Sequence, residues 1–275
     1  MLFRSSISGG SLKNGAITAD SYTVSGGTIS VALNGSGAAL TKTGAGEAVL
    51  GALNGYAGPT TVSLGKLSLA VNGALSASAD LSVGGGELAL GTTAQTAATV
   101  VLSSGSITGG GLTATNSFTV NSGLVSSVLS GAVTLTKETA GEVVLSNLNT
   151  YSGQTTVNAG KLTLSVDGAL YATSTGLVVS GGELALGTTS QTATNVTLSG
   201  GSITGGTLTA TAFSVSSGTI SSVLGGGPLT MNGASQIVTL SGANTYTGAI
   251  TVSAGVLKAG SANAFGPTSG GGVSP

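Results

Sequence analysis

The sequence predicts an all-β protein, a right-handed parallel β-helix (β-solenoid) built of Gly-rich repeats. Three observations lead to this fold class. Short runs alternate apolar and hydroxyl residues, related segments recur at a spacing of 95 positions, and the 275 residues include 49 Gly but only 5 Tyr and 4 Phe. Because bulky side chains are scarce, the interior must be narrow and filled by small aliphatic residues.

The strands are predicted from runs such as ELAL, KLTL, TTV and TLTAT. Alternation places Leu, Val and Ile on one face and Thr or Ser on the other. Strands of about 4–5 residues with turns of about 2–4 residues make coils of roughly 20 residues when three strands complete a turn. An antiparallel sandwich or barrel is the competing architecture, but a sandwich must fill a gap of ~10 Å between its sheets. Small aliphatics stacked in columns fill a thin solenoid better.

Self-comparison divides the chain into related parts. The segment from Thr41 aligns without a gap with the segment from Thr136, and GGELALGTT from Gly85 recurs from Gly181. The end segments are incomplete copies, so we interpret the chain as a slice of a longer array. We expect one β-solenoid over 1–275, with a partial repeat at 1–40, repeat units at 41–135 and 136–230, and a partial degenerate repeat at 231–275.

Composition excludes several classes of function. The chain has no Cys and no His, which removes disulfides, thiolate metal sites and the commonest metal ligand. The net charge of -1 comes from scattered charges, so nothing favours nucleic acid or an anionic membrane as a partner. No apolar run approaches a membrane span, and MLFRSSISGG lacks the apolar region of a signal peptide. We expect no cofactor and no metal.

Five positions recur in three copies: an Asn, a Tyr two residues later, two Gly and a Leu. The Asn is expected to accept a left-handed backbone at a corner or to hydrogen-bond neighbouring backbone. The Tyr is expected to cover a Gly-rich corner rather than to form an exposed row for glycan stacking. The Gly residues mark turns in which a Cβ would be strained, and the Leu should point inward. These positions are Asn54, Asn149, Asn244, Tyr56, Tyr151, Tyr246, Gly58, Gly153, Gly248, Gly65, Gly160, Gly255, Leu67, Leu162 and Leu257.

Charged residues also recur, and we interpret them as solvated corner charges. A glycosidase needs two carboxyl groups within about 5–10 Å, and no such pair is evident, so we expect no enzyme. The recurring charges are Lys42, Glu47, Lys66 and Glu87 in one unit and Lys137, Glu142, Lys161 and Glu183 in the next; the third copy has Asn232, Ile237 and Val256 at three of these places.

The segment LSGANTYTGAITVSAGVLKAG from Leu240, with related copies from Leu50 and Leu145, resembles the autotransporter-associated β-strand repeat. That repeat occurs in passenger regions of bacterial autotransporters and haemagglutinin-like surface proteins. The resemblance implies a β-helical stalk outside the outer membrane, often with an adhesive role, and carries no catalytic residues. It also implies an export signal upstream and a membrane β-barrel downstream, both of which we expect outside these residues.

We therefore expect a non-catalytic structural or adhesive stalk, extracellular or on the bacterial surface. Its candidate partners are host or neighbouring-cell glycans or matrix proteins. One alternative is a β-helical carbohydrate-binding or polysaccharide-degrading module, which would need charges clustered on one face. Another is an ice- or crystal-binding solenoid, suggested by the many Thr. TTV and TLTAT do not recur once per coil, however, so we expect no regular Thr array.

Overall fold

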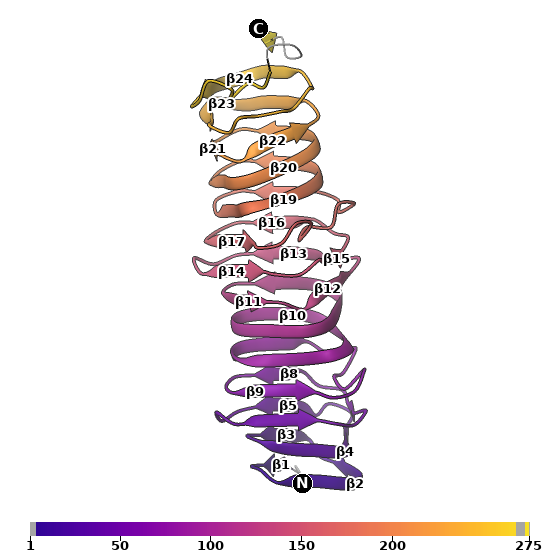
Figure 1. The fold of residues 1–275 in the computed structure, drawn as a ribbon. Helices are drawn as coiled ribbons and strands as arrows, with labels where there is room; N and C mark the ends of the chain where they lie inside the picture. The colour runs from indigo at the N-terminus through magenta and orange to yellow at the C-terminus, as the bar shows by residue number, and fades with distance from the viewer. Residues whose placement is uncertain (1–3, 268–272, 275) are drawn as a thin grey trace. The chain divides into compact units, whose positions relative to one another are not determined.

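The computed structural model describes residues 4–267 and 273–274, and every regular element within these ranges is a β-strand. The chain forms two compact units, Met1–Val133 and Thr134–Pro275. Within each unit, parallel strands from successive coils lie side by side, as the stacked ribbons in Figure 1 show. The predicted all-β parallel solenoid is confirmed.

In the described part of the chain, the first unit consists of strands β1 to β12, and β10 is long because it continues around more than one coil. They are β1 (Arg4–Ile7), β2 (Ser11–Thr18), β3 (Ser21–Val24), β4 (Gly27–Gly35), β5 (Ala39–Lys42), β6 (Glu47–Leu50), β7 (Gly55–Tyr56), β8 (Thr60–Val62), β9 (Lys66–Leu69), β10 (Leu81–Val120), β11 (Gly123–Val125) and β12 (Val128–Gly131).

Three parallel ladders run along the first unit. In the first ladder Tyr22 pairs with Ser5 and Leu40, and Thr60 pairs with Leu40 and Leu81, so each coil returns the chain to the same ladder. The second ladder joins the start of β4 to β6 and β9, and the third joins the end of β4 to β7. The predicted coil length and its three strand segments are therefore confirmed.

The second unit repeats this plan. Its strands are β13 (Thr134–Lys137), β14 (Glu142–Leu145), β15 (Thr150–Tyr151), β16 (Thr155–Val157), β17 (Lys161–Leu164), β18 (Leu177–Val179), β19 (Glu183–Leu198), β20 (Ser202–Val215), β21 (Gly218–Ile220), β22 (Val223–Gly226), β23 (Leu229–Leu240), β24 (Ile250–Ala259) and β25 (Val273–Ser274). Its first ladder passes through Leu135, Thr155, Leu177, Val196, Phe213, Leu229, Ile250 and Val273.

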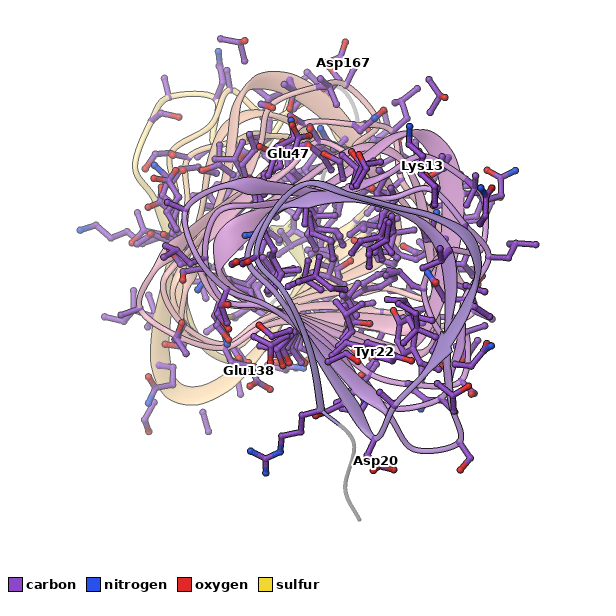
Figure 2. The ribbon with its side chains drawn as sticks, turned by 90° about the horizontal axis from the view of Figure 1, so that it is seen from below. Lys13, Asp20, Tyr22, Glu47, Glu138 and Asp167 are labelled. Carbon is purple, nitrogen blue, oxygen red and sulfur yellow. The ribbon has the colours of Figure 1, made fainter. Side chains whose placement is uncertain are left out.

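The core of each unit is a set of inward columns of aliphatic side chains. Ile29 and Leu50 are fully buried on successive rungs of the first unit, and Leu69 is almost so. In the end-on view of Figure 2, side chains fill the interior of the coils, where Tyr22 points inward while Asp20 lies outside the ribbon. Small stacked side chains thus supply the apolar burial that a larger core would obtain from aromatic residues.

Candidate functional site

The recurring Asn ties three successive coils together through its side-chain amide. Asn54 Oδ1 accepts a hydrogen bond from the Leu33 backbone N–H (2.9 Å), and its Nδ2 donates to the Ala74 carbonyl (2.8 Å). Among described residues other than Gly, only Asn14 and Ser235 have positive φ, so the recurring Asn acts through its amide rather than a left-handed backbone. The matching bonds are Asn149 Nδ2 to Ala169 O (2.9 Å), and Asn244 with Leu224 N (2.8 Å) and Ala264 O (2.6 Å).

The recurring Tyr rings lie inside the coils. Tyr56, Tyr151 and Tyr246 are at most 3% exposed. The hydroxyl groups of Tyr56 and Tyr151 each share a 2.7 Å hydrogen bond with the Thr four residues later, Thr60 or Thr155. Burial raises the pKa of each of the three phenols to about 12. These rings form no surface row and cannot stack on a glycan.

In the third copy, the buried Tyr hydroxyl has a different hydrogen-bond partner. Ile250 replaces the buried Thr, and it lies in the inward column with Leu229. The Tyr246 hydroxyl donates instead to the Ala264 carbonyl (3.2 Å). A buried phenol needs a hydrogen-bond partner, and the fold supplies one in every copy.

The two recurring Gly positions are required for different reasons. Gly65, Gly160 and Gly255 have φ of +69°, +65° and +81°, which favours Gly. Gly58 and Gly248 are not at positive φ, but a Cβ there would overlap the backbone of the preceding coil; at Gly58 it would lie 2.6 Å from the Ala38 carbonyl oxygen. Gly153 lies in the bend between β15 and β16.

The recurring Leu differs in exposure between the copies. Leu67 and Leu162 are fully buried. Leu257 pairs with the buried Val238 but is only half-buried itself. No described strand pairs with the other edge of β24 at this rung, which leaves one side of the Leu257 side chain uncovered.

Two of the supposed corner charges are buried, so that interpretation is wrong for Lys42 and Lys137. Lys42 is 0% exposed and takes an inward place between Val24 and Val62. Its Nζ donates to the carbonyl oxygens of Thr43 (2.6 Å), Gly44 (2.7 Å) and Leu64 (3.0 Å). Lys137 is equally buried and donates to the carbonyls of Thr139 and Ala159. Burial lowers the pKa of both amino groups.

The structural counterpart of these lysines in the third copy is Met231, not Asn232 as the sequence spacing suggested. Met231 is fully buried between Val215 and Val252, the same column position that Lys42 takes between its valines. Irregular pairing around Asn232 shifts the alignment by one residue. One copy therefore fills this place with an apolar side chain of similar length.

The glutamates and the remaining lysines do lie at the surface, in columns of alternating sign. Glu47, Lys66 and Glu87 occupy successive rungs, with the Lys66 ammonium 3.9 Å from the Glu87 carboxylate. Glu142, Lys161 and Glu183 repeat the column, and Lys161 lies 3.7 Å from Glu142. Alternation avoids placing like charges on neighbouring coils, but exposed pairs of this kind add at most about 1 kcal/mol each.

A second buried amide escaped the sequence analysis. Gln95 Oε1 accepts from the Leu75 backbone N–H (3.2 Å), while its Nε2 donates to the Val71 carbonyl (2.7 Å) and the Thr93 hydroxyl (2.9 Å). Gln191 makes the same three kinds of bond in the second unit. The signal was present, because GTTAQTA and GTTSQTA keep this Gln between the two copies.

The first ladder of each unit carries an outward column of hydroxyl groups, contrary to the expectation of no regular Thr array. Coil lengths vary, so the column is invisible as a sequence period, yet nearly every rung contributes a Thr or Ser. In the first unit the column is Ser6, Thr23, Thr41, Thr61 and Ser82; in the second it is Thr136, Thr156, Val178, Thr197, Ser214, Thr230 and Thr251. We call these columns the hydroxyl ladders.

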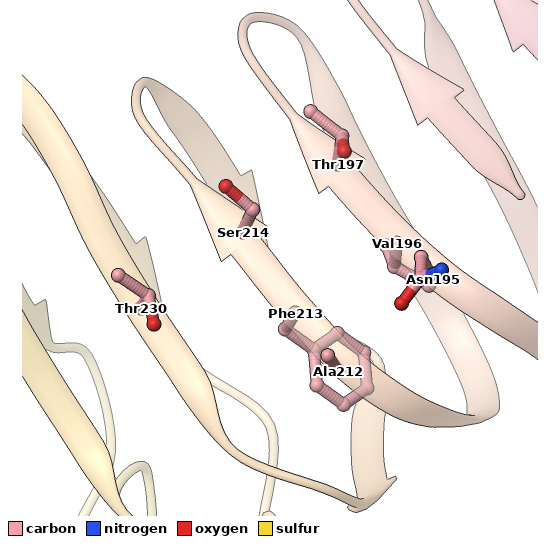
Figure 3. Close-up of a pocket in the computed structure, with 7 residues that line it drawn as sticks. All are labelled: Asn195, Val196, Thr197, Ala212, Phe213, Ser214 and Thr230. Carbon is pink, nitrogen blue, oxygen red and sulfur yellow. The ribbon is translucent and has the colours of Figure 1, made fainter.

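A hollow of about 380 Å³ lies beside the hydroxyl ladder of the second unit. Figure 3 shows Thr197, Ser214 and Thr230 on three neighbouring strands along it, with Asn195 and Ala212 beside this row, on the strands of Thr197 and Ser214. The lining residues are Asn195, Val196, Thr197, Ala212, Phe213, Ser214 and Thr230. The hollow is thus formed by neutral side chains.

Neither a cluster of metal ligands nor a membrane-spanning helix is present in the described residues. No three His, Cys, Asp or Glu side chains gather where they could ligate a metal ion. None of the described residues forms a helix with the length and apolar character needed to cross a membrane.

Comparison with known families confirms the resemblance of the recurring segments. Residues 40–69, 135–165 and 229–259 match the passenger-associated-transport-repeat. Each match contains one Asn, Tyr, Gly and Leu set described above. Searches of curated proteins and of solved structures returned no match.

Proposed function

We propose that this chain is a non-catalytic structural segment of the passenger region of a bacterial surface or secreted protein. The observation that carries the proposal is the coincidence of three passenger-associated transport repeats with coils whose strands pair in parallel from one coil to the next. The repeat implies export to the cell surface or medium, and the parallel coils provide a scaffold for display.

The interior chemistry suits such a role. The chain has no Cys, so its coils are held by backbone ladders, aliphatic columns and the amides of Asn54 and Gln95, without disulfides. In a stacked repeat, stability is the sum of coil and interface terms. Such a stack can be lengthened by adding coils, as a spacer or a display surface requires.

Adhesion through weak contacts along the side of the coils is the finer part of this proposal. The outward hydroxyl ladders offer neutral donors and acceptors on many rungs, and the alternating charge columns offer no strong field of one sign. Glycans and matrix proteins are the partners that such a surface would contact, one weak site at a time.

The test is surface exposure on intact cells. Antibodies raised against the purified chain should label intact cells of the source bacterium or precipitate the protein from its medium. External protease should remove the cell-bound label. Labelling only after permeabilisation, with no protein in the medium, would refute the passenger role.

The hydroxyl ladders also favour a second candidate, an ice- or crystal-binding surface. Hydroxyl groups recur at the spacing of neighbouring strands, about 4.8 Å, over five rungs in the first unit. Thermal hysteresis of the purified chain decides this candidate. A freezing-point depression no larger than that of an equal concentration of albumin would exclude ice binding.

A further inference from the structure

We propose that the hollow beside the hydroxyl ladder of the second unit is a binding site for a neutral glycan. This inference rests on the adhesive part of the proposed function and deepens it by naming a site and a ligand class. The site comprises Asn195, Thr197, Ser214 and Thr230 around the small apolar side chain of Ala212.

The first argument is unused hydrogen-bonding capacity. Almost every buried polar side chain described above bonds to backbone, whereas within the described residues the side chains of Asn195, Thr197 and Thr230 make no hydrogen bond. The Ser214 hydroxyl accepts one from Asn232 Nδ2 (3.2 Å), which leaves its own proton to donate. These four side chains offer the mixture of donors and acceptors that sugar hydroxyl groups need.

The second argument is electrostatic. Residues 184–257 contain no Asp, Glu, Lys or Arg, although they span four coils of the second unit. A phosphorylated, sulfated or uronic acid ligand would find no opposite charge there, and burying part of its charge would be unfavourable. The hollow therefore selects against anionic polymers and accepts neutral polyhydroxylated ones.

The third argument is shape. A volume of about 380 Å³ is within the range of small-ligand sites, roughly 300–1,000 Å³. The polar groups lie on three neighbouring rungs, about 4.8 Å apart, so the site is elongated across the strands (Figure 3). Ala212 is the apolar side chain on the outward face of the hollow, whereas Val196 and Phe213 (2% exposed) point into the coil beneath it. An extended chain of neutral sugars fits this groove along the ladder.

The experiment is an NMR titration of the isotopically labelled full chain. The probes are maltohexaose, cellohexaose, mannohexaose and xylohexaose, with hexagalacturonate as the anionic comparison. We expect at least one neutral probe to bind weakly and to shift the amides of Asn195, Thr197, Ser214 and Thr230, while hexagalacturonate shifts none of them. Absence of shifts with all four neutral probes, or shifts confined to other coils, would overturn the proposal.

Paired variants separate the hollow from the hydroxyl ladder in general. Asn195→Ala combined with Thr230→Val should weaken binding about tenfold, which corresponds to ~1.4 kcal/mol. The matched control, Thr41→Val with Thr61→Val, removes hydroxyls from the ladder of the first unit and should change nothing. Val is compatible with this column, because Val178 already occupies one rung. Equal weakening by both pairs would overturn the assignment to the hollow.

The outcome is independent of the test for surface display. If antibodies label intact cells but no probe sugar binds in the titration, the passenger role stands and this site is rejected. Sugar binding at the four residues by a protein that never reaches the surface would support the site and reject the passenger role.

Discussion

The buried lysine gives the sharpest test of how the coils are stabilised. Lys42→Met replaces an ammonium group that is 0% exposed with an apolar group of similar length, and Met231 shows that the fold accepts this side chain at the equivalent place. The variant therefore removes the charge and the hydrogen bonds with little change in volume. We expect it to lower the free energy of unfolding.

The magnitude follows from the three carbonyl contacts of Lys42 Nζ, at 2.6, 2.7 and 3.0 Å. A hydrogen bond to a charged group contributes ~1.5–3 kcal/mol, so three contribute ~4.5–9 kcal/mol. Desolvation of the ammonium opposes this by several kcal/mol. Because the pKa of Lys42 is lowered, desolvation outweighs the part of these bonds that the charge adds. The net loss for Lys42→Met should therefore reflect the bonds that the uncharged amine keeps, about 1–3 kcal/mol near pH 10 and less at neutral pH. Lys42→Ala also leaves a cavity and should lose more, about 2–5 kcal/mol.

The loss should depend on pH with a defined sign. Burial lowers the pKa of Lys42 below its ordinary 10.5, so the unfolded chain binds this proton more tightly than the folded chain. The parent therefore gains stability relative to Lys42→Met as pH rises from the folded pKa to 10.5. The difference between parent and variant should be smaller at neutral pH than near pH 10.

Urea unfolding followed by circular dichroism measures the difference, with hydrogen exchange at the neighbouring rungs because stacked coils need not unfold in one step. The control is Lys13→Met at an exposed position of the same unit, which should change stability by less than about 0.5 kcal/mol. A Lys42→Met protein as stable as the parent near pH 10, or a difference that shrinks from neutral pH toward pH 10, would refute the reasoning.

Three further predictions concern the interior. Burial raises the pKa of Tyr56 and Tyr151 from 10.0 to about 12. Each phenol should therefore contribute about 2–3 kcal/mol to the free energy of unfolding, fully present below pH 10 and lost between pH 10 and 12. Ionisation at pH 10 with the far-ultraviolet dichroism intact would contradict their burial. Leu162→Asp places an unpaired charge at a fully buried site and should lower the free energy of unfolding by more than about 4 kcal/mol. The control Leu148→Asp, at a side chain that is 58% exposed, should lower it by less than about 0.5 kcal/mol. Equal melting temperatures of the two variants would refute the inward assignment of Leu162. Gly160→Ala, at φ +65° and against a carbonyl of the preceding coil, should cost about 2–5 kcal/mol in urea unfolding, and a neutral result would show that this corner can relax.

Alternation predicted the strands and the inward Leu residues because period-2 spacing fixes which face a side chain takes. The same rule places Lys42 inward, two residues after Leu40, but its charge favoured a surface interpretation. The structure resolves the conflict through the corner carbonyls of Thr43, Gly44 and Leu64, which only the folded turn brings together. At this position, the alternation of side chains along the strand predicts burial better than the residue type does.

The hydroxyl ladders, in contrast, could not be predicted from the sequence pattern. Their rungs are unevenly spaced along the sequence of the second unit: the step from Ser214 to Thr230 is short, and the step from Thr156 to Val178 is long. No fixed period therefore connects the first rung to the last. The column exists because each coil absorbs its extra residues in turns while the first ladder keeps its register. A surface of this kind can be recognised only after the strand pairing is known.

The division between inward and outward positions also explains why the recurring segments do not reveal the proposed ligand. The matched segments carry the Asn, Tyr and Gly residues that close the corners, and the Asn and Tyr are buried except for Asn54, which is half-buried. The residues that line the hollow lie between the second and third matched segments, except for Thr230, which lies inside the third. Outward side chains in these intervening coils can change without loss of the corner bonds. The repeat therefore specifies how the coils stack, while the outward side chains of the coils between repeats are free to vary, and the proposed ligand site lies among them.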